Sequence, residues 1–165
     1  YLQMLGGLLP EWESGYNGSN FNGDLKLINC ETLVESVIEP SMKLADRLTA
    51  LYPTMQAQLD TAMVHTYQYY NMKKFYDLGD YATKVAEYTK DPQLISIAKE
   101  LNEALDKAIL GRQDMHYSPH GDLPKFSLSV VLCSQADYQA KTSWDYTFKE
   151  AYEYTNWNIF TGWGD

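Results

Sequence analysis

The chain has 165 residues, 45% of them hydrophobic and 21% charged, so it is long enough for one globular domain and too apolar to be disordered. No apolar run approaches the roughly 20 residues that cross a bilayer, which argues against a membrane span. The formal net charge is -9 and no basic cluster is longer than Lys73-Lys74, which argues against nucleic acid and anionic membranes as partners.

The first residues of the chain are apolar and end at Pro10. They predict a short helix interrupted by Gly6-Gly7, and they lack the basic flank and the cleavage site of a signal peptide. The chain opens on this segment without an initiator Met, so we expect it to be a piece of a longer protein. Residues Glu11–Gly23, rich in Gly, Asn and Ser, predict a surface loop.

Helical periodicity dominates the middle of the chain. Asn29 is a suitable cap for a helix whose apolar stripe resumes after Pro40. Because proline lacks the amide donor and crowds the preceding turn, this is either one kinked helix or two helices that meet at Pro40. We expect Pro53 to end it and Thr54 to cap a further helix that runs to about His65.

Two more helices are predicted downstream, each with an aspartate at its start. Asp77 should cap a helix that runs to about Thr89, because its carboxylate can accept amides of the first turn. Asp91-Pro92 is a stronger start, since proline is favoured at the first helical position. The apolar stripe that follows should continue through Leu110 and stop at Gly111.

The best strand in the sequence is Phe126–Leu132, a run that becomes continuously apolar. Residues 114–117 could form a second short strand beside it, and Ser143 could cap a last helix before a tail rich in tryptophan. An apolar strand needs either the upstream helices or another body to cover it, and we expect another body. The fold class is therefore α+β, mostly helical with a few short strands, in a single domain over residues 1–165.

Cys30 is the first candidate for chemistry, because a helix N-terminus favours a nucleophilic thiolate. It would need a base such as His65, His116 or His120 beside it, and nothing in the spacing places one there. The favoured interpretation is a buried structural cysteine. Cys30 and Cys133 form either one disulfide or remain two free thiols.

The remaining titratable residues give no recognisable site. His116, His120 and Cys133 do not have a known metal-ligand spacing, and Asp77 and Asp80 are ordinary helix-start residues. The chain contains none of the common hydrolase, zinc-peptidase, phosphate-loop or EF-hand motifs. We therefore predict no catalytic, cofactor-binding or metal-binding residues, and no cofactor.

Aromatic residues are unusually frequent, with 14 Tyr and 4 Trp. The favoured interpretation is a core with many amphipathic borders, and the alternative is a platform for ligands. That alternative is an aromatic-rich, secreted or surface binding module for glycan or protein, in which exposed tryptophans stack on sugar rings. The tryptophans concerned are Trp12, Trp144, Trp157 and Trp163. A third hypothesis is a helical scaffold whose strand edge is covered by a partner protein.

Two segments resemble a known family. Residues 75–82, Phe-Tyr-Asp-Leu-Gly-Asp-Tyr-Ala, are similar to an aromatic-Asp-Leu-x-Asp-aromatic helix start, and Phe126–Leu132 with the aromatic tail is similar to a terminal strand. The tail residues concerned are Trp144, Phe148, Trp157 and Thr161-Gly162-Trp163. Both patterns resemble clostripain-like cysteine peptidases, caspase-fold enzymes that cleave after basic residues and are secreted by gut anaerobes.

The resemblance transfers no catalytic residue. His120-Gly121 does not precede an apolar strand, and Cys30 lacks the small and acidic flank of the family's nucleophile. The resemblance implies a non-catalytic C-terminal region that packs on and stabilises a peptidase core encoded upstream in the same precursor. It also implies an extracytoplasmic or secreted bacterial location, and a separate C-terminal fragment would suit enzymes that are processed into two chains.

Overall fold

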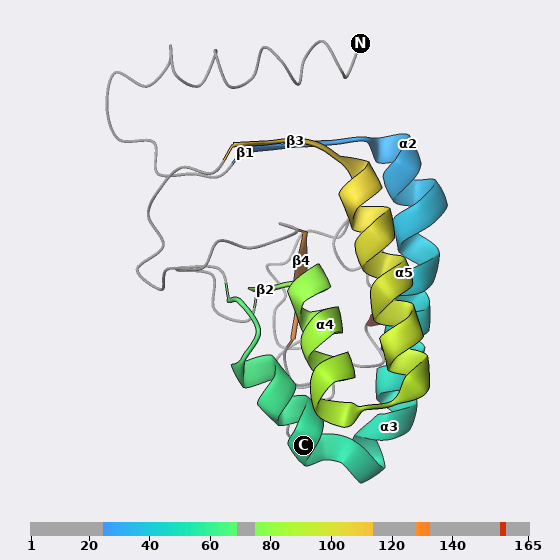
Figure 1. The fold of residues 1–165 in the computed structure, drawn as a ribbon, viewed down its shortest axis with the longest axis vertical. Coiled ribbons are helices and arrows are strands. Elements are labelled where there is room, and N and C mark those ends of the chain that lie inside the picture. The colour runs from blue at the N-terminus through green and yellow to red at the C-terminus, as the bar shows by residue number, and fades with distance from the viewer. Residues whose placement is uncertain (1–24, 69–74, 114–127, 133–155, 158–165) are drawn as a thin grey trace, which may run out of the picture.

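The computed structural model describes residues 25–68, 75–113, 128–132 and 156–157 (Figure 1). These residues are mostly helical and include two antiparallel two-stranded ladders, which confirms the predicted fold class. The predictions for the first helix, the loop before Gly23, the strand at residues 114–117 and the helix after Ser143 lie outside the described residues.

The helical part begins at a well-formed cap. Strand β1 (Leu25–Ile28) leads into helix α2 (Cys30–Thr32), and the side chain of Asn29 accepts hydrogen bonds from the amides of Glu31 and Thr32 at 3.1 and 3.2 Å. These bonds satisfy amides that have no partner inside the helix, which confirms the predicted cap.

Two prolines shape the long helix that follows. A π turn, η1 (Leu33–Val37), connects α2 to α3 (Ile38–Val64), and the helix continues through Pro40 without a break. A wide turn just before a proline gives its ring room against the preceding carbonyls. The predicted helix end at Pro53 is wrong, because α3 continues and only bends at Met55, where φ is -126° and ψ is 22°.

The predicted cap at Thr54 is also wrong. Its hydroxyl donates back to the carbonyl of Leu51 at 3.2 Å instead of accepting an amide of a new first turn. Burial of apolar side chains on both sides of the bend, such as Leu51 and Leu59, keeps the chain helical at a position where local propensity favours a break.

Helices α4 and α5 start as predicted. The carboxylate of Asp77 accepts the Asp80 amide at 2.9 Å before α4 (Leu78–Thr89). Asp91 accepts the amides of Gln93 and Leu94 before α5 (Pro92–Ala108). Helix α5 was predicted to run through Leu110, but it ends at Ala108. The chain continues directly into strand β3 (Ile109–Gln113).

The first ladder lies at one end of a pair of antiparallel helices. The N-terminal part of α3 and the whole of α5 run side by side in opposite directions (Figure 1), so the strand before α2 and the strand after α5 meet. β1 and β3 pair antiparallel, with Leu25 opposite Gln113 and Leu27 opposite Gly111. The amide of Asn29 donates to the carbonyl of Ala108 at 2.8 Å and closes the junction.

The second ladder joins the two segments that resemble the peptidase family. β2 (Phe75–Asp77) pairs antiparallel with β4 (Ser129–Val131), and Phe75 lies opposite Val131. The predicted strand is confirmed over Ser129–Val131, while residues 126 and 127 lie outside the described part. The Leu78 amide donates to the carbonyl of Leu128 at 2.7 Å and continues the pairing.

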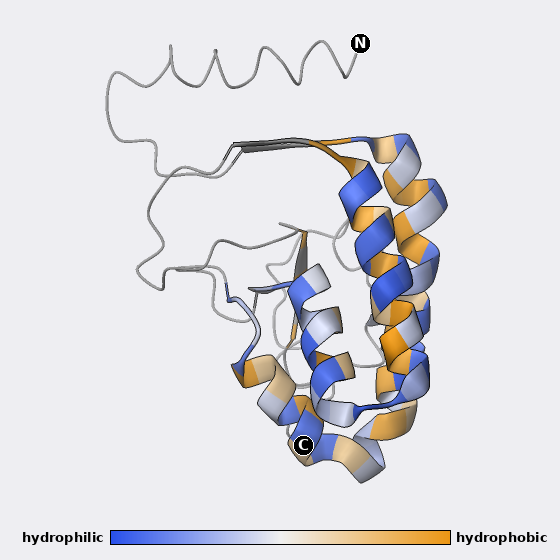
Figure 2. Cartoon of the chain, in the orientation of Figure 1, coloured by the Kyte–Doolittle hydropathy of each residue, from blue (hydrophilic) through white to orange (hydrophobic). Residues whose placement is uncertain are grey.

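The core lies between α3, α4 and α5, and the ladder β2–β4 closes it on one side. Hydrophobic and hydrophilic residues form alternating bands along these helices, so each helix has an apolar face (Figure 2). Each leucine that is fully buried contributes roughly 1.5–3 kcal/mol relative to an exposed one. The largest fully buried hydrophobic side chains are Leu44, Leu48, Leu59, Tyr81, Val85, Leu94, Leu101 and Leu105.

Part of the apolar strand is buried within this chain. Val130 and Leu132 are each 3% exposed and belong to the same core cluster as the helices. Trp157 is also 3% exposed and lies in that cluster. These two strand residues therefore belong to the chain's own core, and the expectation that another body covers the rest of the strand stays a prediction.

Two buried side-chain atoms, the Tyr81 hydroxyl and Asn102 Oδ1, lack a hydrogen-bond partner among the described residues. The hydroxyl of Tyr81 is buried without a hydrogen bond, and burial raises the pKa of Tyr81 well above its ordinary value. Because an unpaired buried hydroxyl is costly, Tyr81→Phe should leave the free energy of unfolding unchanged or raise it by up to about 1 kcal/mol in urea titration. Tyr81→Leu, which also removes the ring beside Trp157, should lower it; a Phe variant as unstable as the Leu variant would contradict this account.

Candidate docking groove between two helices

Among the described residues, Cys30 and His65 are not brought together as a cysteine–histidine pair. Cys30 is a free, exposed thiol at the start of α2, so the expected buried structural cysteine is wrong. His65 follows the last residue of α3 and stacks on Tyr88 of α4, with ring centroids 5.4 Å apart. Cys30 and His65 therefore flank the helical run at opposite ends. His116, His120 and Cys133 lie outside the described residues.

The two aspartates near the start of α4 have structural roles. Asp77 caps the helix, and Asp80 accepts the backbone amide of Tyr67 at 2.7 Å. Both carboxylates are thus occupied by amides, as expected for helix-start residues. Within the described ranges, no group of three or more His, Cys, Asp or Glu side chains is placed to hold a metal ion. No helix in these ranges is both long and apolar enough to cross a membrane.

Trp157 has a structural role that removes it from any sugar-binding surface. Its indole Nε1 donates to the hydroxyl of Ser41 at 2.8 Å, and its ring lies 6.5 Å from that of Tyr81. A side chain buried in this way cannot stack on a glycan, so that hypothesis is wrong for Trp157. Trp12, Trp144 and Trp163 lie outside the described residues.

A groove of about 530 Å³ runs along the outer seam between α3 and α5. On each helix, the residues that line the groove are spaced three or four positions apart, as expected for one face of a helix. Because the two helices are antiparallel, Lys43 binds Glu100 at one end of the groove, and Arg47 binds Asp91, the residue before α5, at the other. The lining residues are Lys43, Asp46, Arg47, Ala50, Gln93, Ser96, Ile97 and Glu100.

An ion pair closes the end of the groove at the start of α5. Arg47 binds Asp91 through two nitrogens, with Nε 3.1 Å from Oδ1 and Nη2 on Oδ2. The Arg47 guanidinium lowers the pKa of Asp91, and the amide of Leu94 adds to the effect against the opposing effect of burial. Asp91 thus has two roles, since it caps α5 and forms the ion pair that links that helix to α3.

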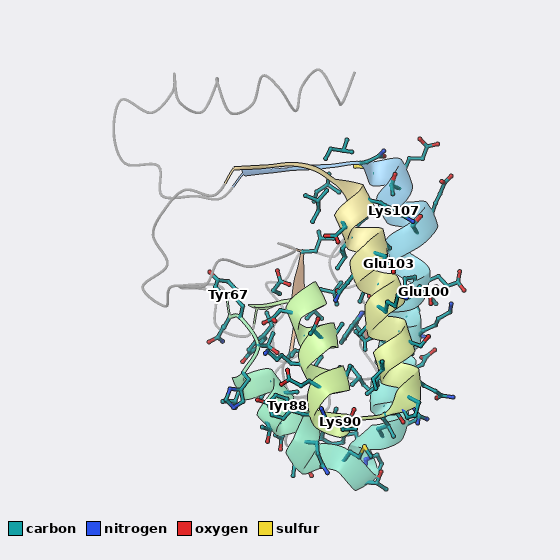
Figure 3. The ribbon with its side chains drawn as sticks, in the orientation of Figure 1. Tyr67, Tyr88, Lys90, Glu100, Glu103 and Lys107 are labelled. Carbon is teal, nitrogen blue, oxygen red and sulfur yellow. The ribbon has the colours of Figure 1, made fainter. Side chains whose placement is uncertain are left out.

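The other end of the groove carries an exposed cluster of three charges. The Nζ of Lys43 lies 3.0 Å from Glu39, one turn earlier on α3, and 3.2 Å from Glu100. Glu100 lies on α5 (Figure 3). The hydrogen bonds that Lys43 donates to Glu39 and Glu100 raise the pKa of Lys43. One ammonium is therefore shared by two carboxylates, and the cluster keeps one negative charge.

The chain's own tail reaches the rim of the groove. The amide nitrogen of Asn156 donates to Asp46 Oδ1 at 2.8 Å. Asn156 is neutral, so this contact orients the Asp46 carboxylate without cancelling its charge. Counting the ion-pair partners, four carboxylates surround two cations, and the excess lies at Asp46 and at the Glu39–Lys43–Glu100 cluster.

Sequence reasoning did not find this groove. The spacing of Lys43 and Arg47 is an ordinary i, i+4 pattern, and the partners that give it meaning lie on α5, more than forty residues away. Their meeting depends on the antiparallel register of α3 and α5, for which the sequence carries no local signal.

Comparison with protein-family models, with curated proteins and with solved structures finds no match for this chain.

Proposed function

We propose that this chain is the non-catalytic C-terminal part of a clostripain-like cysteine peptidase, and that it packs on and stabilises the core that cleaves after basic residues. The finer features follow from the same resemblance: the core is encoded upstream in the same precursor, and the protein is exported from a bacterial cell. Residues 1–165 form a single domain of that precursor.

One observation carries the proposal. The segments that resemble the family are more than forty residues apart in the sequence, yet they form one structural unit. β2 and the cap of α4 come from the first segment and pair with β4 from the second, and Trp157 of the tail packs against Tyr81 of α4. The pairing of the two segments on which the resemblance rests supports the proposal that they belong to one pattern.

The chemistry of the described residues agrees with a non-catalytic role. Cys30 is exposed at a helix start, and the His65 ring stacks on Tyr88. A thiol without an adjacent base is a weak nucleophile at neutral pH. The glycan-binding alternative loses Trp157, and no observation on the described residues favours it over the peptidase proposal.

We expect the isolated 165-residue chain to leave peptides with Lys or Arg before the scissile bond intact, because the part of the chain that the structure describes brings no base beside Cys30. Release of a fluorescent leaving group from Lys- and Arg-ended substrates measures this. Cys30→Ala is the control variant. Turnover by the wild-type chain that disappears in Cys30→Ala would overturn the proposal and assign catalysis to Cys30.

A further inference from the structure

We propose that β2 and the helices α3 and α4 form a binding site for a separate polypeptide, an extended apolar strand followed by a tryptophan. In this structure the chain's own residues 128–132 and 156–157, here called the docking segment, fill the site. A second copy of that segment, supplied as a free peptide, binds in its place. The inference is independent of the peptidase proposal, because it rests only on contacts within this chain.

The strand half of the site is the backbone of β2 and the start of α4. β4 pairs antiparallel with β2, and the Leu78 amide donates to the carbonyl of Leu128 at 2.7 Å. The other edge of β2 is held without the docking segment, since the Asp77 amide donates to the carbonyl of Tyr67 at 2.9 Å. β2 therefore has a support of its own on one side, and an added strand completes the other side.

Buried side chains of the docking segment give the site its specificity. Val130 and Leu132, two residues apart on the strand, are each 3% exposed, as is Trp157. The indole Nε1 of Trp157 donates to Ser41 of α3 at 2.8 Å, and its ring lies 6.5 Å from that of Tyr81 in α4. Backbone pairing accepts many sequences, so these apolar positions and the indole select the ligand.

The helices have a core that does not depend on the docking segment. Apart from Val130, Leu132 and Trp157, the buried hydrophobic residues of the described core all come from residues 37–108. Helices α3, α4 and α5 pack on one another, and the ladder β1–β3 joins the segments before α2 and after α5. A body with its own core and a strand added to one edge is the arrangement by which domains take up a strand from another polypeptide.

The test uses the full 165-residue chain with a protease recognition sequence placed between residues 114 and 126, cut after folding so that both parts are present. A fluorescent peptide of residues 126–165 is added, and its uptake is followed by anisotropy. We expect the cut parts to co-migrate in size exclusion at about 10 µM and to take up the peptide at that concentration. The uncut chain, whose site is filled by a tethered segment, should take up the peptide at least about tenfold more weakly.

Variants of the peptide test the two halves of the site. Trp157→Ala should weaken binding at least about a hundredfold, since a buried aromatic is lost. Ser129→Val with Val130→Ser keeps the composition, removes the valine from its buried position and should weaken binding about tenfold. Asn156→Gly, which loses an exposed contact and tolerates the positive φ found there, is the matched control and should bind within about threefold of wild type.

Circular dichroism of the cut and uncut chains follows their folding. Parts that separate or unfold after cutting, equal uptake by the cut and uncut chains, or equal binding of the wild-type and Trp157→Ala peptides would overturn the inference. None of these outcomes bears on the peptidase proposal, so the failure of one is distinguished from the failure of the other.

Discussion

Trp157→Ala should lower the free energy of unfolding by about 3–5 kcal/mol, the range for truncating a buried aromatic side chain. The side chain is 3% exposed, its ring packs against Tyr81, and its indole nitrogen donates to Ser41 at 2.8 Å. Removing it opens a cavity between α3 and α4 and leaves the Ser41 hydroxyl, itself buried, without this donor. Urea titration followed by circular dichroism measures the loss.

Two neighbouring variants separate the contributions to this effect. Trp157→Phe keeps most of the packing and loses the hydrogen bond to Ser41, so it should cost about 1–2 kcal/mol. Asn156→Gly removes only an exposed contact with Asp46 and keeps a residue that tolerates the positive φ of 61° found there, so it should cost less than about 0.5 kcal/mol. If Trp157→Ala were as mild as Asn156→Gly, the tail would not belong to the core.

Asp91→Ala is the second large effect, with an expected loss of about 2 kcal/mol. The substitution removes the cap of α5, worth about 0.5–2 kcal/mol, and also leaves Arg47 without its partner. Asp91→Asn keeps an amide oxygen for the cap and loses only the charge, so it should be milder. Equal losses in the two variants would show that the ion pair, and not the cap, determines the effect.

The same residue gives a pH dependence with a definite sign. The pKa of Asp91 is lowered in the folded chain, chiefly by Arg47, so folding favours the ionised form. Its contribution to stability is therefore complete above the unfolded pKa of about 3.9 and is lost as the pH falls through the folded value. The stability difference between wild type and Asp91→Asn should be constant near neutral pH and shrink below about pH 4. A difference that grows on acidification would contradict the assignment.

The features that the sequence predicted correctly are those set by neighbouring residues. Asn29, Asp77 and Asp91 each cap a helix, because a short side chain with an acceptor bonds amides two or three residues ahead whatever the rest of the fold does. The mostly helical class and the strand at Ser129–Val131 follow in the same way from the period of the apolar residues.

The features that the sequence missed depend on distant contacts. Pro53 does not end α3, because burial of Leu51 and Leu59 on either side outweighs the lost hydrogen bond. Helix α5 ends at Ala108 because Ile109 and its neighbours pair with β1. That pairing depends on a distant segment and cannot be predicted from the residues around Ala108. The groove could not be foreseen for the same reason, since it exists only once Lys43 and Arg47 face α5.

The most direct test of the central claim is the half-life of peptidase activity in the polypeptide encoded upstream of Tyr1, measured at elevated temperature with and without this chain. Binding to the folded core should stabilise it by about 2.7 kcal/mol when the free chain is at one hundred times the dissociation constant. We predict that the half-life of hydrolysis after Lys or Arg lengthens as this chain is added and reaches a plateau. An unchanged half-life at saturating concentrations of the chain would contradict the claim that it stabilises a peptidase core.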